Sequence, residues 1–537
     1  MRGDRPPGIL HWVAWQVVIL WLLAVVLALV GFLPALGRRS GLLALAAGVA
    51  VGAYVLRRDP AERTPLAQDR MAASAALAGA VVIALGLRLW AALHAGVPLG
   101  YDYGFYKAAF EAYEGGVPSD PPHWLDLQFE PALPALHGVL HGVAGLSAGQ
   151  HLTGLWSLLA CALVPAAFVA VRPLAGDRAA AVTALLAAVS VTQIEAYAYL
   201  YEKNVVALLL FLVALLLLGR RAWIPAGVLL AGVAILNRPT ALLALLALPI
   251  VAAMRLRTQW RGWALAAGAG VALALPVWLA WPETFLATGS TVAQESVATL
   301  ATGPSGSGGT FLERGEYLAA AAAYLPLALV AMALAWRRLA LRLPAVVLAV
   351  TGLYVVLRLP LHLRFLLMAD LAAVLLAGVG LVATVPRRWA WGATAVLVAL
   401  AAAPAIAGIV EPSTPHVFVT PAQFGAIQQL RSLPADATFV ADNLRAPYVL
   451  AESGHRTFGP GLFDDPHDKA DWDRFWSGLD EGGVADFVAP YEARTLYVVQ
   501  VEESGPDWGR ESVHEPAFTL VSTEGGVNLW QWTGGSA

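Results

Sequence analysis

The chain has 537 residues, of which 58% are hydrophobic and only 13% are charged, whereas an ordinary soluble domain carries roughly 25% charged residues. Its mean hydropathy of +0.65 indicates stretches more apolar than a globular core requires, and we interpret the chain as an integral membrane protein. The net charge of −3 argues against nucleic acid as a partner. The single cysteine, Cys161, excludes a disulfide framework.

Thirteen apolar segments are long enough to cross a hydrocarbon core of ~30 Å. They are residues 10–36, 41–56, 71–94, 150–171, 179–195, 204–219, 222–237, 239–254, 262–281, 317–336, 344–360, 365–385 and 389–409. We therefore expect a mainly α, polytopic protein of about 13 transmembrane helices. The first segment lacks a small-residue cleavage site and a second follows at once, which favours an anchor over a removed signal peptide.

Basic residues predict the orientation of these segments. With the amino terminus in the cytoplasm, eighteen basic residues fall in inner connections and eight in outer ones. The positive-inside rule therefore favours this topology, in the cytoplasmic (inner) membrane. It places two long connections on the outer face, at residues 96–149 and 282–316.

The first outer loop, 96–149, is acidic and begins with Gly100-Tyr-Asp-Tyr-Gly104. Four aromatic residues that follow share one face of a helix, and they are Tyr103, Tyr106, Phe110 and Tyr113. This spacing predicts a helix lying in the membrane interface. Such a helix would hold the carboxylate of Asp102 where water meets lipid headgroups. The alternative is that Asp102 is only a helix cap or a solvated loop carboxylate.

A second apolar stripe follows Glu130-Pro131 and predicts another interfacial helix. His137 and His141 are four residues apart on it and therefore share a face. Two histidines so placed are candidate ligands for a divalent metal, although ordinary interfacial histidines show the same spacing and a carboxylate would have to come from elsewhere. We therefore assign no certain cofactor and keep a divalent metal as an open possibility.

The second outer loop, 282–316, contains Gly303-Pro-Ser-Gly-Ser-Gly-Gly309. This stretch lacks the lysine and the preceding strand of a phosphate-binding loop, and we interpret it as a plain flexible loop.

The composition becomes polar from Glu411 onward, where seven basic residues oppose nineteen acidic ones. Residues 438–442 and 495–501 are typical of strands, and 518–523 with 527–532 of a hairpin. Residues 421–433, 447–453 and 469–479 are typical of helices. We expect a small extracytoplasmic α/β domain at 410–537, after a membrane module at 71–409 and a two-helix extension at 1–70.

Three outer motifs complete the pattern: Glu195-Ala-Tyr-Ala-Tyr-Leu-Tyr-Glu-Lys-Asn204, Leu236-Asn-Arg-Pro-Thr240 and His362-Leu-Arg-Phe-Leu-Leu367. The other parts are a carboxylate-bearing first outer loop after a span with Leu-Arg88-Leu, interfacial helices and a carboxy-terminal outer domain. This whole pattern resembles the GT-C superfamily of integral membrane glycosyltransferases. Similar enzymes include protein O-mannosyltransferases, the aminoarabinose transferase of lipid A and mycobacterial arabinosyltransferases. The chain departs from the first two in carrying Asp-Tyr-Gly where many have Asp-Glu, and Glu-Pro-Ala-Leu-Pro where many have Pro-Pro-Leu.

This resemblance implies an inverting transfer of a sugar from a polyprenyl-phosphate donor to an acceptor hydroxyl on the outer face of the membrane. It matches Asp102 to the catalytic aspartate, which would serve as general base, with Glu111 and Glu130 as further candidates. Cations at outer helix ends would stabilise the departing phosphate. These candidates are Lys203, Arg238, His362 and Arg364. Each could instead be a cation that merely snorkels at a helix end.

Arg88 and Asp370 lie deeper within predicted spans, where unpaired charge is costly, and we expect a structural ion pair there or a place in the donor cavity. The rival function is a lipid or polysaccharide transporter or flippase. Such a protein would favour charged or broken helices at mid-membrane and internal repeats, and no repeat is evident. A catalytically silent scaffold is a third possibility. The sequence specifies neither the sugar nor the acceptor, which could be a lipid, a glycan or a protein.

Overall fold

The structure is a computed structural model that describes residues 68–118, 125, 130–254, 256–302, 309, 311–335, 342–410, 417–460, 462, 466–477, 481–491, 493, 495–501 and 518–532. The predicted spans at 10–36 and 41–56, and with them nearly all of the 1–70 extension, lie outside these residues. The chain divides into two compact units. Unit 1 contains the described residues up to Trp90, from Ala112 to 118, Leu125 and from Glu130 to 410, and unit 2 contains Ala91–Glu111 and the described residues after 413.

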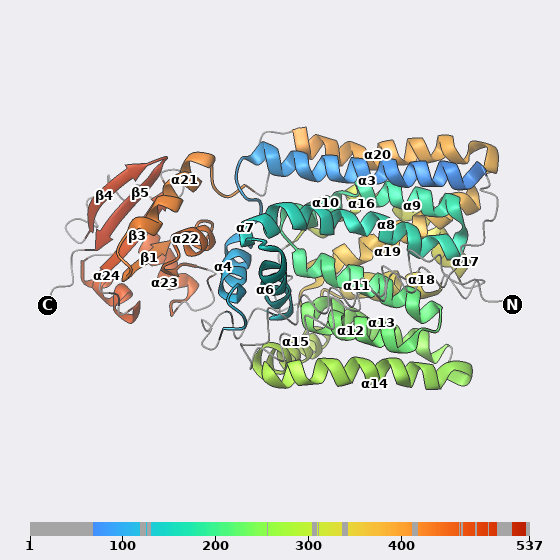
Figure 1. Ribbon diagram of the computed structural model, residues 1–537, viewed down its shortest axis with the longest axis horizontal. Coiled ribbons are helices and arrows are strands. Elements are labelled where there is room, and N and C mark those ends of the chain that lie inside the picture. Colours follow the sequence, from blue (N-terminus) through green and yellow to red (C-terminus); the bar gives the residue numbers. More distant parts are fainter. Residues whose placement is uncertain are drawn as a thin grey trace. The chain divides into compact units, whose positions relative to one another are not determined.

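All regular elements among the described residues of unit 1 are helices, and its long helices run roughly along one axis (Figure 1). The α-helices are α3 (Gln68–Ala95), α6 (Ala132–Ala144), α7 (Ala148–Gln150), α8 (Trp156–Ala175), α9 (Asp177–Val189), α10 (Val191–Ala198), α11 (Glu202–Gly219), α12 (Trp223–Leu236), α13 (Arg238–Ala253), α14 (Leu256–Ala280), α15 (Thr288–Thr302), α16 (Arg314–Ala321), α17 (Leu325–Ala335), α18 (Arg342–Val356), α19 (Phe365–Thr384) and α20 (Ala390–Val410). π-helical turns occur at η1 (His151–Leu155) and η2 (Glu283–Ala287), and 3₁₀ turns at η4 (His362–Arg364) and η5 (Arg387–Trp389).

The helices follow the predicted spans from residue 71 onward. Among the described residues, five helices are long and apolar enough to cross a membrane, or seven if two bent pairs each count as one span. Several other predicted spans, such as those at α12, α13 and α18, are apolar helices shorter than that length. A mainly helical membrane fold is therefore confirmed, whereas the number thirteen stays a prediction.

Two predicted spans are broken, and Asp370 of α19 lies at both breaks. The break between α9 and α10 bends the chain by 44°, and the break between α16 and α17 by 80°. The buried carboxylate of Asp370 accepts hydrogen bonds from Ser190 Oγ and Gln193 Nε2, each at 2.8 Å, and from the hydroxyl of Tyr324. The carboxylate is thus stabilised by neutral donors at the helix ends that it joins.

Arg88 is also buried, but it does not pair with Asp370. Its guanidinium donates to the carbonyl oxygens of Ala84 at 3.2 Å and Gln193 at 3.5 Å. The prediction of an ion pair for Arg88 and for Asp370 is therefore wrong within the part of the chain that the structure describes. Backbone carbonyls and neutral side chains replace it, because the break at Ser190 leaves polar groups available inside the bundle.

Unit 2 is built on a five-stranded sheet with strand order β2-β1-β3-β5-β4. The strands are β1 (Ala437–Ala441), β2 (Arg456–Phe458), β3 (Thr495–Val501), β4 (Phe518–Glu524) and β5 (Val527–Trp532). Strands β2, β1 and β3 are parallel, and β5 pairs antiparallel with both β3 and β4. The β4–β5 turn is Gly525-Gly526, and both glycines have positive φ, as a tight hairpin requires.

Helices of unit 2 cover this sheet (Figure 1). They are α21 (Pro421–Gln429), α22 (Ala446–Ser453), α23 (Lys469–Ser477) and α24 (Glu481–Val488), with 3₁₀ turns η6 (Leu430–Ser432) and η7 (Ala489–Tyr491). Trp472 and Phe475 of α23 and Phe487 of α24 pack with strand residues in one apolar core. The expected small sheet after residue 411 is therefore confirmed, with β2 and α24 in addition to the expected elements.

Helix α4 (Tyr103–Tyr113) lies near the start of the predicted first outer loop, 96–149. Its first nine residues belong to unit 2. Its aromatic face is buried in protein, since Tyr103 and Tyr106 are 5% and 1% exposed. The ring of Tyr103 stacks on Tyr448 of α22. The aromatic face of α4 therefore packs against protein, and the position of this helix in the membrane interface stays a prediction.

Gly104 explains how closely α4 approaches the C-terminal part of unit 2. A Cβ at this position would lie 1.7 Å from the carbonyl oxygen of Pro447. Only glycine permits that contact between two backbones.

Candidate functional site

A cavity of about 1030 Å³ lies within unit 1 and is lined by both charged and apolar side chains. Two arginines, Arg238 and Arg364, and three glutamates, Glu130, Glu283 and Glu295, supply charged groups to its wall. Apolar side chains cover much of the rest, among them Leu242, Leu245, Leu246, Trp278 and Phe285. Such a lining suits a ligand with an anionic group joined to a long apolar chain.

The sequence Leu236-Asn-Arg-Pro-Thr240 positions Arg238 at the first residue of α13. Asn237 caps this helix by accepting from the Thr240 backbone N–H at 2.9 Å, and Pro239 fits the first turn because its missing N–H has no helical partner there. The Asn237 side chain also donates to Asn204 Oδ1 at 2.6 Å. This bond joins the first turns of α13 and α11, which carry Arg238 and Lys203.

Glu130 lies between these two cations. Its Oε1 is 2.9 Å from Arg238 Nε and its Oε2 is 2.6 Å from Lys203 Nζ, while the side chain is only 2% exposed. Burial alone raises the pKa of Glu130, but the positive charges of Lys203 and Arg238 outweigh burial and lower the pKa to about 2. The carboxylate is therefore ionised at neutral pH, and the three side chains together carry one positive charge.

Arg364 reaches the same cavity from the turn before α19. Its guanidinium lies over the ring of Tyr201, 5.7 Å from the ring centre. The preceding loop has positive φ at Arg358 (53°) and Leu361 (61°), a conformation that is costly for residues other than glycine. Leu359, Pro360 and Leu361 line the cavity, so this loop shapes the wall beside Arg364.

The other two predicted phosphate ligands are not among the lining residues. Lys203 donates to Glu130, which is one of the lining residues. His362 lies in the 3₁₀ turn before α19, where its Nδ1 is 3.1 Å from the carbonyl oxygen of Leu359. The structure thus brings Glu130, Arg238 and Arg364 to one cavity wall and gives Lys203 a supporting position.

Asp102 belongs to unit 2, whereas the cavity is lined by unit 1 alone. Asp102 precedes α4, and its carbonyl oxygen accepts from the Tyr106 backbone N–H at 3.0 Å. Burial, and then the charge of Asp102, raise the pKa of the Tyr101 and Tyr448 hydroxyls. Tyr448 Oη also donates to the Gly100 carbonyl oxygen at 2.9 Å, which orders the turn that carries Asp102.

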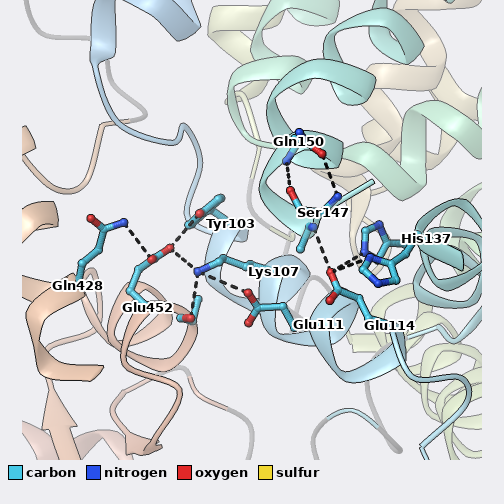
Figure 2. Close-up of polar contacts among 12 residues, drawn as sticks. Tyr103, Lys107, Glu111, Glu114, His137, Ser147, Gln150, Gln428 and Glu452 are labelled. Atoms are coloured by element: carbon cyan, nitrogen blue, oxygen red, sulfur yellow. Dashed lines mark hydrogen bonds and ion pairs between the residues drawn. The ribbon is translucent and has the colours of Figure 1, made fainter. Parts of the chain in front are cut away.

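A buried polar cluster fixes the start of α4 to α22 within unit 2, and Figure 2 shows its side chains converging on Glu452. Glu452 Oε1 is 2.9 Å from both Lys107 Nζ and Tyr103 Oη. Gln428 donates to the other oxygen at 3.2 Å. Glu111 is paired with Lys107 at 3.7 Å, so this candidate carboxylate contributes to the same cluster.

His137 and His141 do have a carboxylate beside them, which is Glu114, just after α4. Glu114 Oε1 is 3.4 Å from His137 Nε2, as Figure 2 shows for this pair of side chains. The same oxygen is 3.5 Å from His141 Nδ1, and all three residues belong to unit 1. His137 Nδ1 is 2.9 Å from His151 Nδ1, and His151 Nε2 is 2.6 Å from Glu202 Oε1. His137, His151 and Glu202 are fully buried.

Sequence reasoning missed Glu114, His151 and Glu202 as members of this cluster. His151 lies in the π-helical turn η1, a local irregularity that often accompanies functional sites. The available signals were the positions of Glu114 and Glu202 directly beside predicted helix ends. Glu283 and Glu295 also line the cavity without having been predicted to do so.

No family model and no curated protein matches the sequence. Solved structures do match its fold. The chain is similar to ArnT from Cupriavidus metallidurans bound to undecaprenyl phosphate, with a TM-score of 0.59 and 14% identity over 87% of this chain and 98% of that one. It is also similar to the oligosaccharyltransferase AglB from Archaeoglobus fulgidus in complex with an inhibitory peptide and a dolichol-phosphate, with a TM-score of 0.57 and 13% identity over 79% and 69%.

The apo form of the Archaeoglobus oligosaccharyltransferase gives the same result, with a TM-score of 0.57 and 14% identity over 80% of this chain and 70% of that one. These are membrane glycosyltransferases of the GT-C superfamily. The resemblance expected from the sequence is therefore confirmed at the level of the fold. With its apolar helices, the chain has the architecture of a multi-pass membrane protein.

Proposed function

We propose that the chain is a glycosyltransferase that moves a sugar from a polyprenyl-phosphate donor to an acceptor hydroxyl outside the cytoplasmic membrane. The observation that carries the proposal is the cavity of unit 1, where two arginines share an apolar wall inside a GT-C fold. A polyprenyl phosphate has the same two parts, an anion and a long hydrocarbon. The similar structures bound to undecaprenyl phosphate and in complex with a dolichol-phosphate support this class of donor.

In this proposal Arg238 and Arg364 bind the donor phosphate. A guanidinium offers a planar set of N–H donors that matches phosphate oxygens. The phosphate gains negative charge as the bond to the sugar breaks, so fixed cations stabilise the transition state more than the ground state. The apolar lining beside them accommodates the start of the prenyl chain.

Glu130 and Lys203 are positioning residues in this proposal. The ion pair to Glu130 fixes the guanidinium of Arg238, which also donates to the Thr284 carbonyl oxygen at 3.1 Å. A carboxylate with a pKa of about 2 is a weak proton acceptor at neutral pH. Glu130 is therefore a poor candidate for the general base.

Asp102 is our candidate for that base. Its place in the first outer loop matches the catalytic aspartate of the GT-C resemblance, and an ordered turn carries it. Deprotonation of the acceptor hydroxyl by a carboxylate, with direct attack on the anomeric carbon, gives inversion at that carbon.

The broken helices do not favour the transporter alternative. Asp370 connects the breaks between α9 and α10 and between α16 and α17, which is a feature expected of some transporters. However, Asp370 does not line the 1030 Å³ cavity, and its carboxylate is satisfied by neutral donors of the same bundle. The break therefore has a structural explanation that needs no transported substrate.

The test is donor use by Arg238→Lys and Arg364→Lys in the purified full-length protein. We expect each change to weaken binding of a polyprenyl-phosphate sugar roughly tenfold, because lysine keeps the charge but loses the fork of donors. Arg358→Lys is the matched control, since Arg358 is exposed and outside the cavity lining. Wild-type protein that binds no polyprenyl phosphate would contradict the proposal.

We also propose that the domain after residue 410 lies outside the cytoplasm and that the module 71–409 carries the catalytic groups. The asymmetry of eighteen inner and eight outer basic residues supports this orientation. Ser477, an exposed residue of α23, suits a cysteine-labelling test. Ser477→Cys should react with an impermeant reagent in intact cells or spheroplasts, and labelling only after lysis would contradict the orientation.

A further inference from the structure

Glu114, His137 and His141 direct three potential ligand atoms to one point beside α6. These atoms all lie within 4.8 Å of one another. Glu114 and His141 are 28% and 33% exposed, whereas His137 is fully buried, so the point is open to solvent on one side only. None of the three residues lines the 1030 Å³ cavity.

We propose that these three residues bind a zinc ion, with water as the fourth ligand. Two imidazoles and one carboxylate form a donor set well suited to zinc, and three protein ligands leave one position for water. The site connects the residue that follows α4 with α6, and through Glu114 with the backbone of α7. It is a structural and positioning site, separate from the sugar-transfer chemistry proposed above.

The two separations measured from Glu114 match those of a tetrahedral ion. With metal bonds of about 2.0–2.1 Å, neighbouring ligand atoms in a tetrahedron stand about 3.4 Å apart. The observed separations from Glu114 Oε1 are 3.4 Å to His137 Nε2 and 3.5 Å to His141 Nδ1. The ion would therefore require little movement of the carboxylate relative to either ring.

Close backbone packing holds Glu114 at this distance. Gly138 of α6 allows the approach, because a Cβ there would lie 2.4 Å from the carbonyl oxygen of Tyr113. The Ala148 backbone N–H donates to Glu114 Oε1 at 3.3 Å. Figure 2 shows the carboxylate directed both at the His137 ring and at the turn that begins with Ser147.

His137, His151 and Glu202 form a buried series of hydrogen bonds whose donors and acceptors can be arranged to leave His137 Nε2 unprotonated, as a metal ligand must be. Zinc on His137 Nε2 leaves Nδ1–H to donate to His151 Nδ1, and His151 Nε2–H then donates to the Glu202 carboxylate. Both histidines are neutral in this arrangement. In other proteins too, carboxylates that accept hydrogen bonds behind metal-binding histidines fix the orientation and tautomer of those rings.

Without a cation, the same contacts need one more hydrogen than neutral histidines supply. A hydrogen between Glu114 and His137, another between the two rings and a third at Glu202 make three, whereas two neutral imidazoles carry two. A metal ion at His137 Nε2 removes the need for the first of these hydrogens, and two neutral imidazoles then satisfy the other two contacts.

Metal binding would replace one existing contact. His141 Nδ1 lies 3.1 Å from the Leu146 carbonyl oxygen, to which a protonated nitrogen donates. That nitrogen must lose its hydrogen to bind zinc. His141 is partly exposed, so water can satisfy the released carbonyl oxygen.

The experiment is a zinc titration of the purified full-length protein in detergent. Wild-type protein should retain about one zinc per chain after removal of excess metal, and cobalt in its place should give the strong visible absorption of a tetrahedral site. His141→Ala and Glu114→Gln should each weaken zinc binding at least tenfold. His94→Ala, which removes an exposed histidine of α3, should leave binding unchanged.

Two further measurements separate ligation from folding. Zinc should raise the thermal midpoint of wild-type protein and of His94→Ala but not that of His141→Ala, while the three midpoints without zinc stay similar. Glu202→Gln should weaken zinc binding by roughly 10–100-fold through its effect on His151 and His137. Equal zinc retention by wild-type protein and His141→Ala would overturn the proposal, and so would wild-type protein that binds no zinc.

Discussion

Asp102 and Glu130 are carboxylates of the same outer loop, yet their surroundings are opposite. Glu130 is 2% exposed and contacts Lys203 and Arg238 directly. Asp102 is half-buried, and its charge acts on the tyrosine hydroxyls of Tyr101 and Tyr448. The first carboxylate is bound directly by two cations, whereas the charge of the second adds to burial in raising the pKa of two neighbouring tyrosine hydroxyls.

This difference separates two chemical roles that the sequence treats alike. A carboxylate bound by two cations loses basicity, because its ionised form is stabilised. Such a carboxylate instead holds the two cations, here Lys203 and Arg238, in fixed positions. Glu130 therefore takes the positioning role, and Asp102 is the proposed base of the reaction.

Among the variants that test this comparison of Asp102 with Glu130, Asp102→Asn should have the largest effect on turnover. Asparagine keeps the size of the side chain but cannot accept the proton, so turnover should fall by roughly 10²–10⁴, as expected for a lost acid–base group. Donor binding should be unchanged. The measurement is sugar transfer from a polyprenyl-phosphate donor, with Asp473→Asn on the exposed surface of α23 as control. Near-normal turnover would remove Asp102 from the mechanism.

Glu130→Gln should have a smaller effect and act on a different step. Loss of the charge releases Arg238 and Lys203 from their common partner, so donor affinity should change by about tenfold while residual turnover at saturating donor persists. Comparison of KM with kcat for this variant measures the split. A loss of turnover as large as that of Asp102→Asn would reverse the two roles.

The smallest expected effect is a pH dependence of stability. The pKa of Glu130 is about 2 in the folded chain, against 4.5 for an ordinary glutamate. Folding therefore favours the ionised form, and its contribution is complete above about pH 4.5 and is lost as the pH falls toward 2.

The thermal midpoint of wild-type protein should accordingly exceed that of Glu130→Gln at pH 7, and the difference should narrow below about pH 4.5. Glu295→Gln is the control, because Glu295 is exposed in the same cavity. A difference that stays constant from pH 7 to pH 3 would contradict the low pKa.

Sequence patterns predicted much of the fold because they depend on short-range periodicity. Apolar length located the helices from residue 71 onward, and alternation with Gly525-Gly526 located the hairpin of unit 2. The position of Arg238 was also predictable, since Asn237 and Pro239 mark the start of a helix. A capped helix with a cation at its first residue is a local signal.

The remaining features depend on contacts between distant segments. Glu114 joins His137 only because Gly138 lets α6 approach the end of α4. The aromatic face of α4 has the spacing of an interfacial helix, but the ring of Tyr103 packs on Tyr448. Asp370 likewise has neutral partners at helix breaks that hydropathy does not reveal.

The close contact between Gly104 and Pro447 has a consequence for biosynthesis. Tyr103 and Glu452, which bond beside it, are 349 residues apart in the chain. A ribosome completes α4 long before it makes α22, so the buried face of α4 waits without its final partner while the membrane helices are inserted. A chain terminated before Ser413 would keep that face exposed permanently. Proteases and chaperones could bind this exposed face of α4 before α22 is made. The time needed to synthesise and fold the last part of the chain therefore determines how long the first outer loop is exposed to proteolysis.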